Sequence, residues 1–172
     1  MINSISNALT WPWMQDFVNT YGWLWPLFEV VHYTGMSLVV GVVIGLDLRI
    51  LGFYKAIPIG AFKPLVNLAV FGFILNLIGG IVFVTGTNTG AEFYVENLSF
   101  QCKVVAMVIA ISNLLIFRFS GLEHRVYAVP AGGIAPGSAK TVAWISLVSW
   151  VAVIIFGRLL MYNDTLLYFL GL

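Results

Sequence analysis

The fold is decided by the stretch Gly22–Arg49, which reads GWLWPLFEVVHYTGMSLVVGVVIGLDLR. A helix that crosses a bilayer needs ~20 predominantly apolar residues, and this stretch supplies them with few charges. Three further stretches have the same character, so the sequence predicts spanning helices over 22–49, 64–87, 100–119 and 140–162. We therefore expect an all-α polytopic membrane protein, a four-transmembrane-helix bundle.

The composition agrees with a chain that lives in lipid. Apolar residues make up 60% of the sequence and charged residues 9%, and the mean hydropathy is +0.98. Soluble domains carry roughly 25% charged residues because they must face water. The net charge of +1 is far from the basic balance of nucleic-acid-binding proteins, so we expect no nucleic-acid partner. Four spanning helices leave no room for a soluble catalytic domain, so residues 1–172 are expected to form one membrane domain surrounded by lipids.

Residues 10–20, TWPWMQDFVNT, are expected to form a short helix at the membrane surface. Thr10 is a candidate N-cap, and Pro12 suits the first helical turn. Amphipathic aromatic side chains favour the headgroup region, and the segment carries Trp11, Trp13 and Phe17. The alternative is a disordered tail that contains two tryptophans. The preceding residues, Met1–Ala8, are polar and lack the features of a secretory signal.

The orientation in the membrane follows from the positions of the cations. Six of the eight Lys and Arg residues flank the first and third connections between the predicted helices, namely Arg49, Lys55, Lys63, Arg118, Arg125 and Lys140. The second connection instead carries two glutamates, Glu92 and Glu96. Because positive residues collect on the cytoplasmic side, both termini are predicted to be extracytoplasmic.

Four ionisable residues fall inside the predicted spans and near their outer ends: Glu29, His32, Lys103 and Arg158. Ionisable groups in lipid are costly and by default mark a bundle interior or a functional site. On the first helix, Asp47 returns to the azimuth of Glu29. Gly41 and Gly45 form a G-x-x-x-G pattern on roughly the opposite side, where backbones are expected to pack closely. The first helix is therefore expected to be central in the bundle.

The first interpretation of this outer-half cluster is a redox-type subunit that binds haem b. His32 would be the axial metal ligand, since imidazole is a ligand of haem iron. Gly35 would leave space for the porphyrin, and Lys103 and Arg158 would neutralise the two propionates. The sixth position would be taken by Met36, by another residue or by none. The second histidine, in the cytoplasmic third connection, is too far away for bis-histidine ligation within one chain.

Two other interpretations stay open. In a structural or accessory subunit of a larger complex, Glu29 would pair with Arg158 or Lys103, and His32 would donate a hydrogen bond to a carbonyl. In a pathway for protons or a small solute, the polar groups would form a relay, and the narrow bundle would have to oligomerise. The relay residues would be Glu29, His32, Asp47, Asn76 and Asn113. In each case a homo-oligomer or a larger membrane complex is expected.

The remaining residues indicate no conventional enzyme. Asp47 and Arg49 are expected to pair locally or to cap the first connection. Cys102 is a single cysteine, which excludes an internal disulfide and a multi-cysteine metal cluster. No phosphate-binding loop, nucleophile triad or multi-histidine metal spacing is present in the sequence.

The first three predicted helices also resemble an uncharacterised family of four-helix bacterial inner-membrane proteins. The resemblance is carried by His32-x-x-Gly35, Gly41, Asp47-Leu48-Arg49, Leu51-Gly52, Asn76-x-x-x-Gly80, Asn97-x-x-Phe100-x-x-Lys103 and Asn113. It implies the topology and a location in the bacterial inner membrane, and no activity. The chain is more distantly similar to copper-resistance and b-type cytochrome membrane subunits, from which it differs by lacking their paired histidines.

Overall fold

The computed structural model describes residues 2–171, and it is all-helical over these residues. Four long helices dominate it: α3 (Leu24–Leu51), α4 (Lys63–Gly86), α6 (Leu98–Phe119) and α8 (Gly137–Leu159). Each begins and ends within three residues of its predicted bounds. All four are long and apolar enough to cross a membrane, and at most 28% of the most apolar window of each is buried inside the molecule. The expectation of an all-α chain with four long apolar helices is confirmed.

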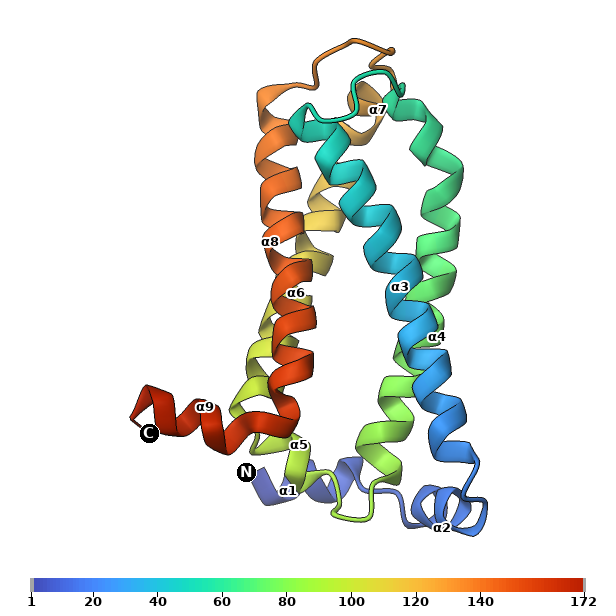
Figure 1. Cartoon of the computed structure of the whole chain (residues 1–172), viewed down its shortest axis with the longest axis vertical. Coiled ribbons are helices and arrows are strands. Elements are labelled where there is room, and N and C mark those ends of the chain that lie inside the picture. Colours follow the sequence, from blue (N-terminus) through green and yellow to red (C-terminus); the bar gives the residue numbers. More distant parts are fainter. Residues whose placement is uncertain (1, 172) are drawn as a thin grey trace.

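The four long helices are arranged as two pairs. Helix α3 packs along α4, helix α6 packs along α8, and contacts between α3 and α8 join the pairs. Figure 1 shows the pairs spreading apart towards the end that carries both termini. The space between the pairs is therefore widest at that end, which we call the outer end. The end with the α3–α4 and α6–α8 connections is called the inner end.

The α3–α4 contact depends on glycines that allow two backbones to touch. A Cβ atom at Gly35 would lie 2.4 Å from the carbonyl oxygen of Gly72. A Cβ atom at Gly79 would lie 2.7 Å from the Cβ atom of His32. Close approach of this kind strengthens van der Waals packing where lipid offers no hydrophobic driving force between helices.

The predicted close-packing stripe of Gly41 and Gly45 is therefore wrong. Gly41 is exposed, and a Cβ atom there would have no neighbour within 4 Å. A Cβ atom at Gly45 would meet the Phe62 side chain and no helix backbone. Helix α3 contacts α4 through Gly35 instead. Gly35 had been expected to leave space for a porphyrin.

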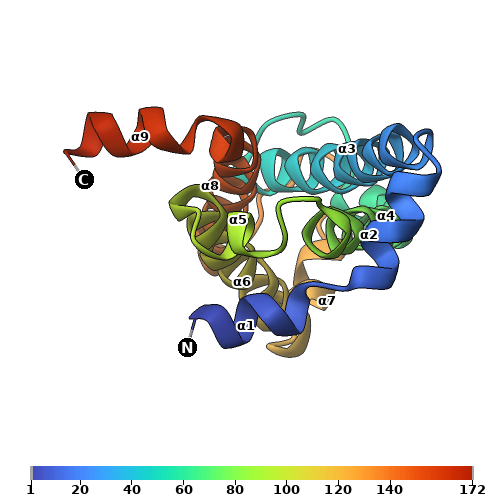
Figure 2. The ribbon, with the colours of Figure 1, turned by 90° about the horizontal axis from the view of Figure 1, so that it is seen from below.

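Short helices cross the outer end of the long ones: α1 (Ile2–Leu9), α2 (Pro12–Thr20), α5 (Glu92–Val95) and α9 (Asn163–Leu170), the last joined to α8 by the 3₁₀ helix η2 (Leu160–Tyr162). Figure 2, which looks at this end, shows α1 and α2 running across it and α9 projecting sideways. The Trp11 amide and the Gln15 amide group donate to the carbonyls of Thr85 and Thr87, at 3.4 and 2.7 Å. Helix α2 thus satisfies carbonyls at the C-terminus of α4, which have no partner within their own helix.

The predicted cap of the 10–20 helix is wrong in detail. The helix begins at Pro12, and its N-cap is Trp11, which makes no side-chain capping bond. The Thr10 hydroxyl instead donates to the Ser6 carbonyl at 3.0 Å and accepts the Ala91 amide at 3.2 Å. Thr10 therefore ties α1 to the segment before α5, and the chain enters α2 directly at its proline.

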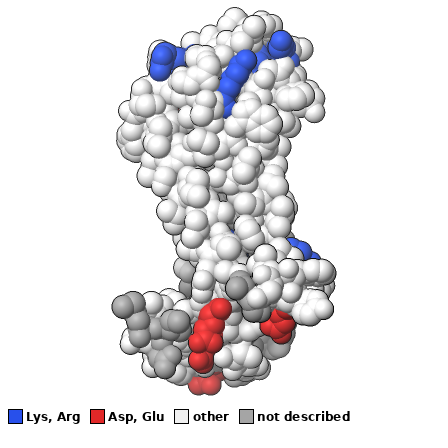
Figure 3. Space-filling model, turned by 90° about the vertical axis from the view of Figure 1, so that its left-hand side faces the viewer, with Lys and Arg blue, Asp and Glu red and all other residues white. Residues whose placement is uncertain are grey.

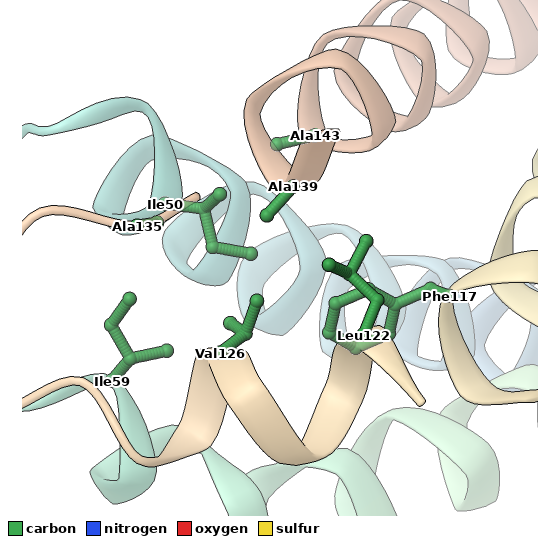
Figure 4. Close-up of a cluster of buried hydrophobic side chains, with 8 residues drawn as sticks. All are labelled: Ile50, Ile59, Phe117, Leu122, Val126, Ala135, Ala139 and Ala143. Atoms are coloured by element: carbon green, nitrogen blue, oxygen red, sulfur yellow. The ribbon is translucent and has the colours of Figure 1, made fainter. Parts of the chain in front are cut away.

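The inner end contains the main hydrophobic core of the described chain. Helix α7 (Leu122–Tyr127) and the 3₁₀ helix η1 (Ile59–Phe62) fold against the ends of the long helices there. Figure 4 shows their side chains meeting those of α3, α6 and α8. The cluster consists of Ile50, Ile59, Phe117, Leu122, Val126, Ala135, Ala139 and Ala143. The connections at this end are thus packed parts of the fold.

Arg49 holds the two inner connections together. Its side chain is fully buried, with 0% of its surface exposed. Its guanidinium group donates to the carbonyls of Ile57, Lys55, Pro130 and Gly133, at 2.5 to 3.4 Å. Of the two expected roles, capping of the first connection is confirmed for Arg49 by its bonds to Lys55 and Ile57. The local pair with Asp47 does not form, because Asp47 faces the space between the helix pairs.

Charge is distributed unequally between the two ends. On the face drawn in Figure 3, most Lys and Arg atoms lie at the inner end, a smaller cationic patch lies nearer the outer end, and the Asp and Glu atoms lie at the outer end. The long middle section between them carries almost no charge on this face. The two cation-rich connections predicted to lie on the same side, α3–α4 and α6–α8, do lie at one end of the molecule.

Candidate functional site

A cavity of about 550 Å³ lies between the two helix pairs in the outer half, and we call it the outer cavity. All four ionisable residues singled out by the sequence line it: Glu29 and His32 from α3, Lys103 from α6 and Arg158 from α8. Met36, one turn beyond His32 on the same face of α3, lines it as well. Side chains from three separate segments therefore converge on one space.

His32 is held by a reciprocal pair of hydrogen bonds with Asn76 of α4. The His32 Nδ1 atom lies 2.8 Å from the Asn76 carbonyl oxygen, and the Asn76 side-chain amide donates to the His32 carbonyl at 3.0 Å. A carbonyl can only accept, so in the neutral ring Nδ1 carries the proton and Nε2 keeps its lone pair. The Phe83 ring packs on the imidazole with centroids 5.2 Å apart. His32 is 9% exposed, and its ring is held at Nδ1 while Nε2 has no hydrogen-bond partner among the described residues.

The charged groups of the outer cavity do not pair with each other. Among the described residues the one ion pair within 4.0 Å is Arg118–Glu123, at the inner end. The Arg158 guanidinium lies over the Tyr162 ring, 5.6 Å from its centroid. The expected pairing of Glu29 with Arg158 or Lys103 is therefore absent. The cavity instead presents one carboxylate and two cations, a formal excess of one positive charge.

Two glycines leave room in the wall of the outer cavity. A Cβ atom at Gly80 would lie 3.6 Å from His32 Cε1, and one at Gly157 would lie 3.8 Å from Lys103 Nζ, both ordinary contacts. Neither glycine is thus required for helix packing, and both line the cavity. Gly35 does not line it, because this residue faces the α4 backbone. Gly35 was expected to leave space for a bound group, but Gly80 and Gly157 are the glycines that line the cavity.

Aromatic side chains, which the sequence analysis did not assign to the site, form much of the remaining wall. They come from all parts of the outer half and include Trp25, Phe83, Phe93, Tyr94, Phe100 and Trp150. Helical spacing could have found Trp25, since it precedes Glu29 by four residues and His32 by seven. Burial raises the pKa of Tyr94, which lies in α5 outside the long helices, to about 12. The phenol therefore stays neutral at physiological pH.

The other two polar residues of the predicted relay lie elsewhere. Asp47 and Asn113 line a second cavity of about 230 Å³ in the inner half, which we call the inner cavity. Three residues, Val39, Phe73 and Trp150, line both cavities and therefore form the wall between them. Asn76 belongs to the outer cavity. The expected polar stripe on α3 thus faces two adjacent cavities.

The donor set of the outer cavity suits a single protein ligand better than a chelate. Within residues 2–171 no group of three or more His, Cys, Asp or Glu side chains gathers where it could hold a metal ion. Structural and catalytic zinc sites need three or four such ligands, whereas haem iron can be held by one axial histidine. The second histidine, His124, lies in α7 at the inner end and takes no part in this cavity.

No protein-family model, curated protein or solved structure matches this chain in the comparisons made. The outer cavity therefore has to be interpreted from its own residues.

Proposed function

We propose that this protein is a redox-type subunit of the bacterial inner membrane that holds one haem b in the outer cavity. His32 is the axial ligand, and Lys103 and Arg158 bind the propionates. Haem bound there would accept and donate single electrons. The proposal rests above all on one observation: His32, whose Nδ1 atom is bonded and whose other ring nitrogen has no hydrogen-bond partner among the described residues, lines a cavity together with two cations that form no ion pair there.

The His32 geometry is the arrangement that iron ligation requires. Histidines that bind metals nearly always donate their other ring hydrogen to a carbonyl, a carboxylate or water, which fixes the tautomer and raises the basicity of the ligating nitrogen. The Asn76 carbonyl at 2.8 Å has this position. An imidazole needed only for packing would not need a cavity beside its second nitrogen.

The size and lining of the cavity fit a flat amphiphilic anion. Pockets for cofactors commonly measure roughly 300–1,000 Å³ and are lined by aromatic side chains with a few polar groups. The outer cavity, at about 550 Å³, lies within this range. Its excess positive charge comes from Lys103 and Arg158, and these two cations match two carboxylates. Glu29 lies in the same wall and would accept a hydrogen bond from a protonated propionate or from water.

The membrane placement belongs to the same proposal. The outer end, with both termini and the helices α1, α2 and α9, would be extracytoplasmic, and α2 would lie in the interface with its tryptophans among the headgroups. Support comes from the cations at the inner end and from the apolar outward surface of the four long helices. That surface is covered by lipids and, in a homo-oligomer or larger complex, partly by partner chains.

An absorption spectrum tests the haem proposal directly. The protein, purified in mild detergent from haem-supplemented cells, is expected to show a Soret band with one haem per chain. His32→Ala should lose the band, whereas His124→Ala, the matched change at the only other histidine, should keep it. Added imidazole should restore part of the band in His32→Ala, because it can occupy the space left by the side chain.

Two results would overturn the proposal. One is a protein that stays colourless and does not take up haemin at one equivalent in titration. The other is a Soret band of unchanged height and position in His32→Ala.

A second candidate function, a proton or small-solute pathway, is favoured by the shared wall of the two cavities. Opening of the wall at Val39, Phe73 and Trp150 would connect Glu29 on the outer side with Asp47 on the inner side. In vesicles that contain a pH-sensitive dye, Trp150→Ala should then raise proton flux and Glu29→Gln should lower it. Equal flux in wild type, both variants and protein-free vesicles would exclude the pathway.

A further inference from the structure

The inner cavity has the character of a second ligand site, separate from the proposed haem site. Its volume of about 230 Å³ exceeds the ~150 Å³ of an engineered apolar cavity that binds benzene. Most of its wall is aliphatic or aromatic, with Val43, Leu46, Ile50, Val66, Phe73 and Ile111 as examples. Polar side chains interrupt this wall, namely Asp47, Asn113, Arg118, Glu123, Tyr127 and Ser146.

Asp47 is the unusual group of this cavity. Its side chain is buried, with 5% of its surface exposed, and its Oδ2 atom has no hydrogen-bond partner among the described residues. Ser146 is a hydrogen-bond partner of the carboxyl group, whereas the sequence neighbour Arg49 is committed to four backbone carbonyls and does not pair with it. Burying a carboxylate without a cationic partner is costly, and a cation supplied by a ligand would offset that cost.

The net charge of the cavity wall selects the sign of the ligand. Besides Asp47, the charged residues that line the inner cavity are Arg118 and Glu123, which lie 3.9 Å apart and balance each other. The formal charge left over is the single negative charge of Asp47. The outer cavity has the opposite sign, with an excess positive charge. A cation therefore suits the inner cavity, and an anion suits the outer one.

The arrangement of acceptors narrows the ligand further. An ammonium group has three N–H donors and no acceptor. Oxygen atoms on Asp47, Asn113 and Ser146, which all line the cavity, can accept hydrogen bonds from them. The side-chain nitrogen of Asn113 already donates to the Val142 carbonyl at 3.0 Å. The side-chain oxygen of Asn113 is therefore the atom that remains to accept a hydrogen bond from a ligand. The remaining apolar wall would enclose a hydrocarbon body.

We propose that the inner cavity binds a small organic ammonium ion, with its charged nitrogen on Asp47 and its apolar body among the side chains of α3, α4 and α6. This site is independent of haem binding, because it shares only its separating wall with the outer cavity. It gives the Asp47 carboxyl group a cationic partner, which the described residues do not supply.

Titration calorimetry with 2-phenylethylammonium chloride tests the proposal on the full chain in detergent micelles. The neutral analogue 2-phenylethanol, of nearly the same shape, serves as the matched ligand and reports partition into the micelle. The ammonium ion is expected to bind saturably at one site, at least ten-fold more tightly than the alcohol. Asp47→Asn, which keeps the side-chain volume, should weaken ammonium binding at least ten-fold and change alcohol binding little.

Two further variants locate the site. Val43→Phe should fill the cavity from the α3 wall and abolish saturable binding while Asp47 is intact, so it remains informative if Asp47→Asn does not fold. Glu29→Gln, the matched carboxylate change in the outer cavity, should leave the affinity unchanged. The proposal is overturned by absence of saturable binding, by equal affinities for ammonium and alcohol, or by unchanged binding in Asp47→Asn or Val43→Phe.

Discussion

His32 and Asn76 hold each other across the α3–α4 contact by two hydrogen bonds, one from the imidazole to a backbone carbonyl and one from the amide side chain to the other backbone carbonyl. The two bonds differ in what a mutation can remove. A change at Asn76 removes its side-chain donor and leaves its carbonyl in place. The orientation of the imidazole therefore depends on the α4 backbone.

We expect Asn76→Leu to lower the free energy of unfolding by about 1 kcal/mol, because one interhelical hydrogen bond is lost. Haem content should remain near that of the wild type, since the Nδ1 acceptor is retained. Thermal unfolding and the Soret absorbance of the same sample measure both quantities. A loss of haem as complete as in His32→Ala would mean that the Asn76 side chain orients the ring.

Two alanine substitutions on α3 should have opposite effects. Gly35→Ala is expected to cost about 2–3 kcal/mol, because its Cβ atom would lie 2.4 Å from the Gly72 carbonyl oxygen and the helices would have to separate. Gly41→Ala should be neutral or stabilising by up to ~1 kcal/mol, because the site is open and alanine favours the helix. Equal unfolding temperatures for the two variants would contradict the packing described for α3 and α4.

The glycines of the outer cavity should respond differently from those of the helix contact. Gly80→Val is expected to fold, since a Cβ atom there meets only ordinary contacts, and to weaken haemin binding by filling space beside the imidazole. Haemin titration followed at the Soret band measures the affinity, and circular dichroism checks the fold. A haemin affinity equal to that of the wild type would place the porphyrin away from Gly80.

Arg49→Met should destabilise the inner end by about 3 kcal/mol, because the carbonyls of four residues lose their shared, fully buried donor at once. Arg49→Lys should recover little, because a single ammonium group cannot reach carbonyls from two separate connections as the planar guanidinium fork does. Amide hydrogen exchange should increase first around residues 55–57 and 130–133. Unchanged exchange in both connections would show that Arg49 does not hold them together.

Two half-buried tyrosines predict a loss of stability in alkali. Burial raises the pKa of Tyr94 to about 12, and burial together with Glu123, partly opposed by Arg118, raises the pKa of Tyr127 to about 12. Both phenols keep their protons in the folded protein over a range where the unfolded chain, with a pKa near ~10, releases them. Stability contributed by the neutral phenols is therefore full below pH ~10 and is lost as pH rises towards about 12.

Tyrosinate absorbance against pH tests this prediction. The difference between the wild type and the double variant Tyr94→Phe, Tyr127→Phe should titrate near pH 12 in the folded protein. The thermal midpoint of the double variant should fall less between pH 10 and 12 than that of the wild type. A difference spectrum that titrates near pH ~10 would mean that neither phenol is buried in solution.

The candidate site was partly predictable from the sequence. Depth along a helix follows from counting residues, so Glu29, His32, Lys103 and Arg158 could be assigned to one level before any contact was known. Their pairing could not be assigned, because it depends on the distance between α3 and the other helix pair. The cavity glycines and the aromatic wall depend on the same distance.

By itself the sequence determined that four long apolar helices form and that their cation-rich connections differ from the rest, because both properties are local sums over hydropathy and charge. Which face of α3 meets α4 became known only from the packed helices, as did the opposite directions of the Asp47 and Arg49 side chains. The same holds for the division of the polar groups between two cavities, which are separated by Val39, Phe73 and Trp150. The apolar residues of α3 are spread around the whole helix, so no amphipathic periodicity marks the face that packs on α4. Its orientation is set by where two glycine-lined backbones can approach, and that requires both helices together.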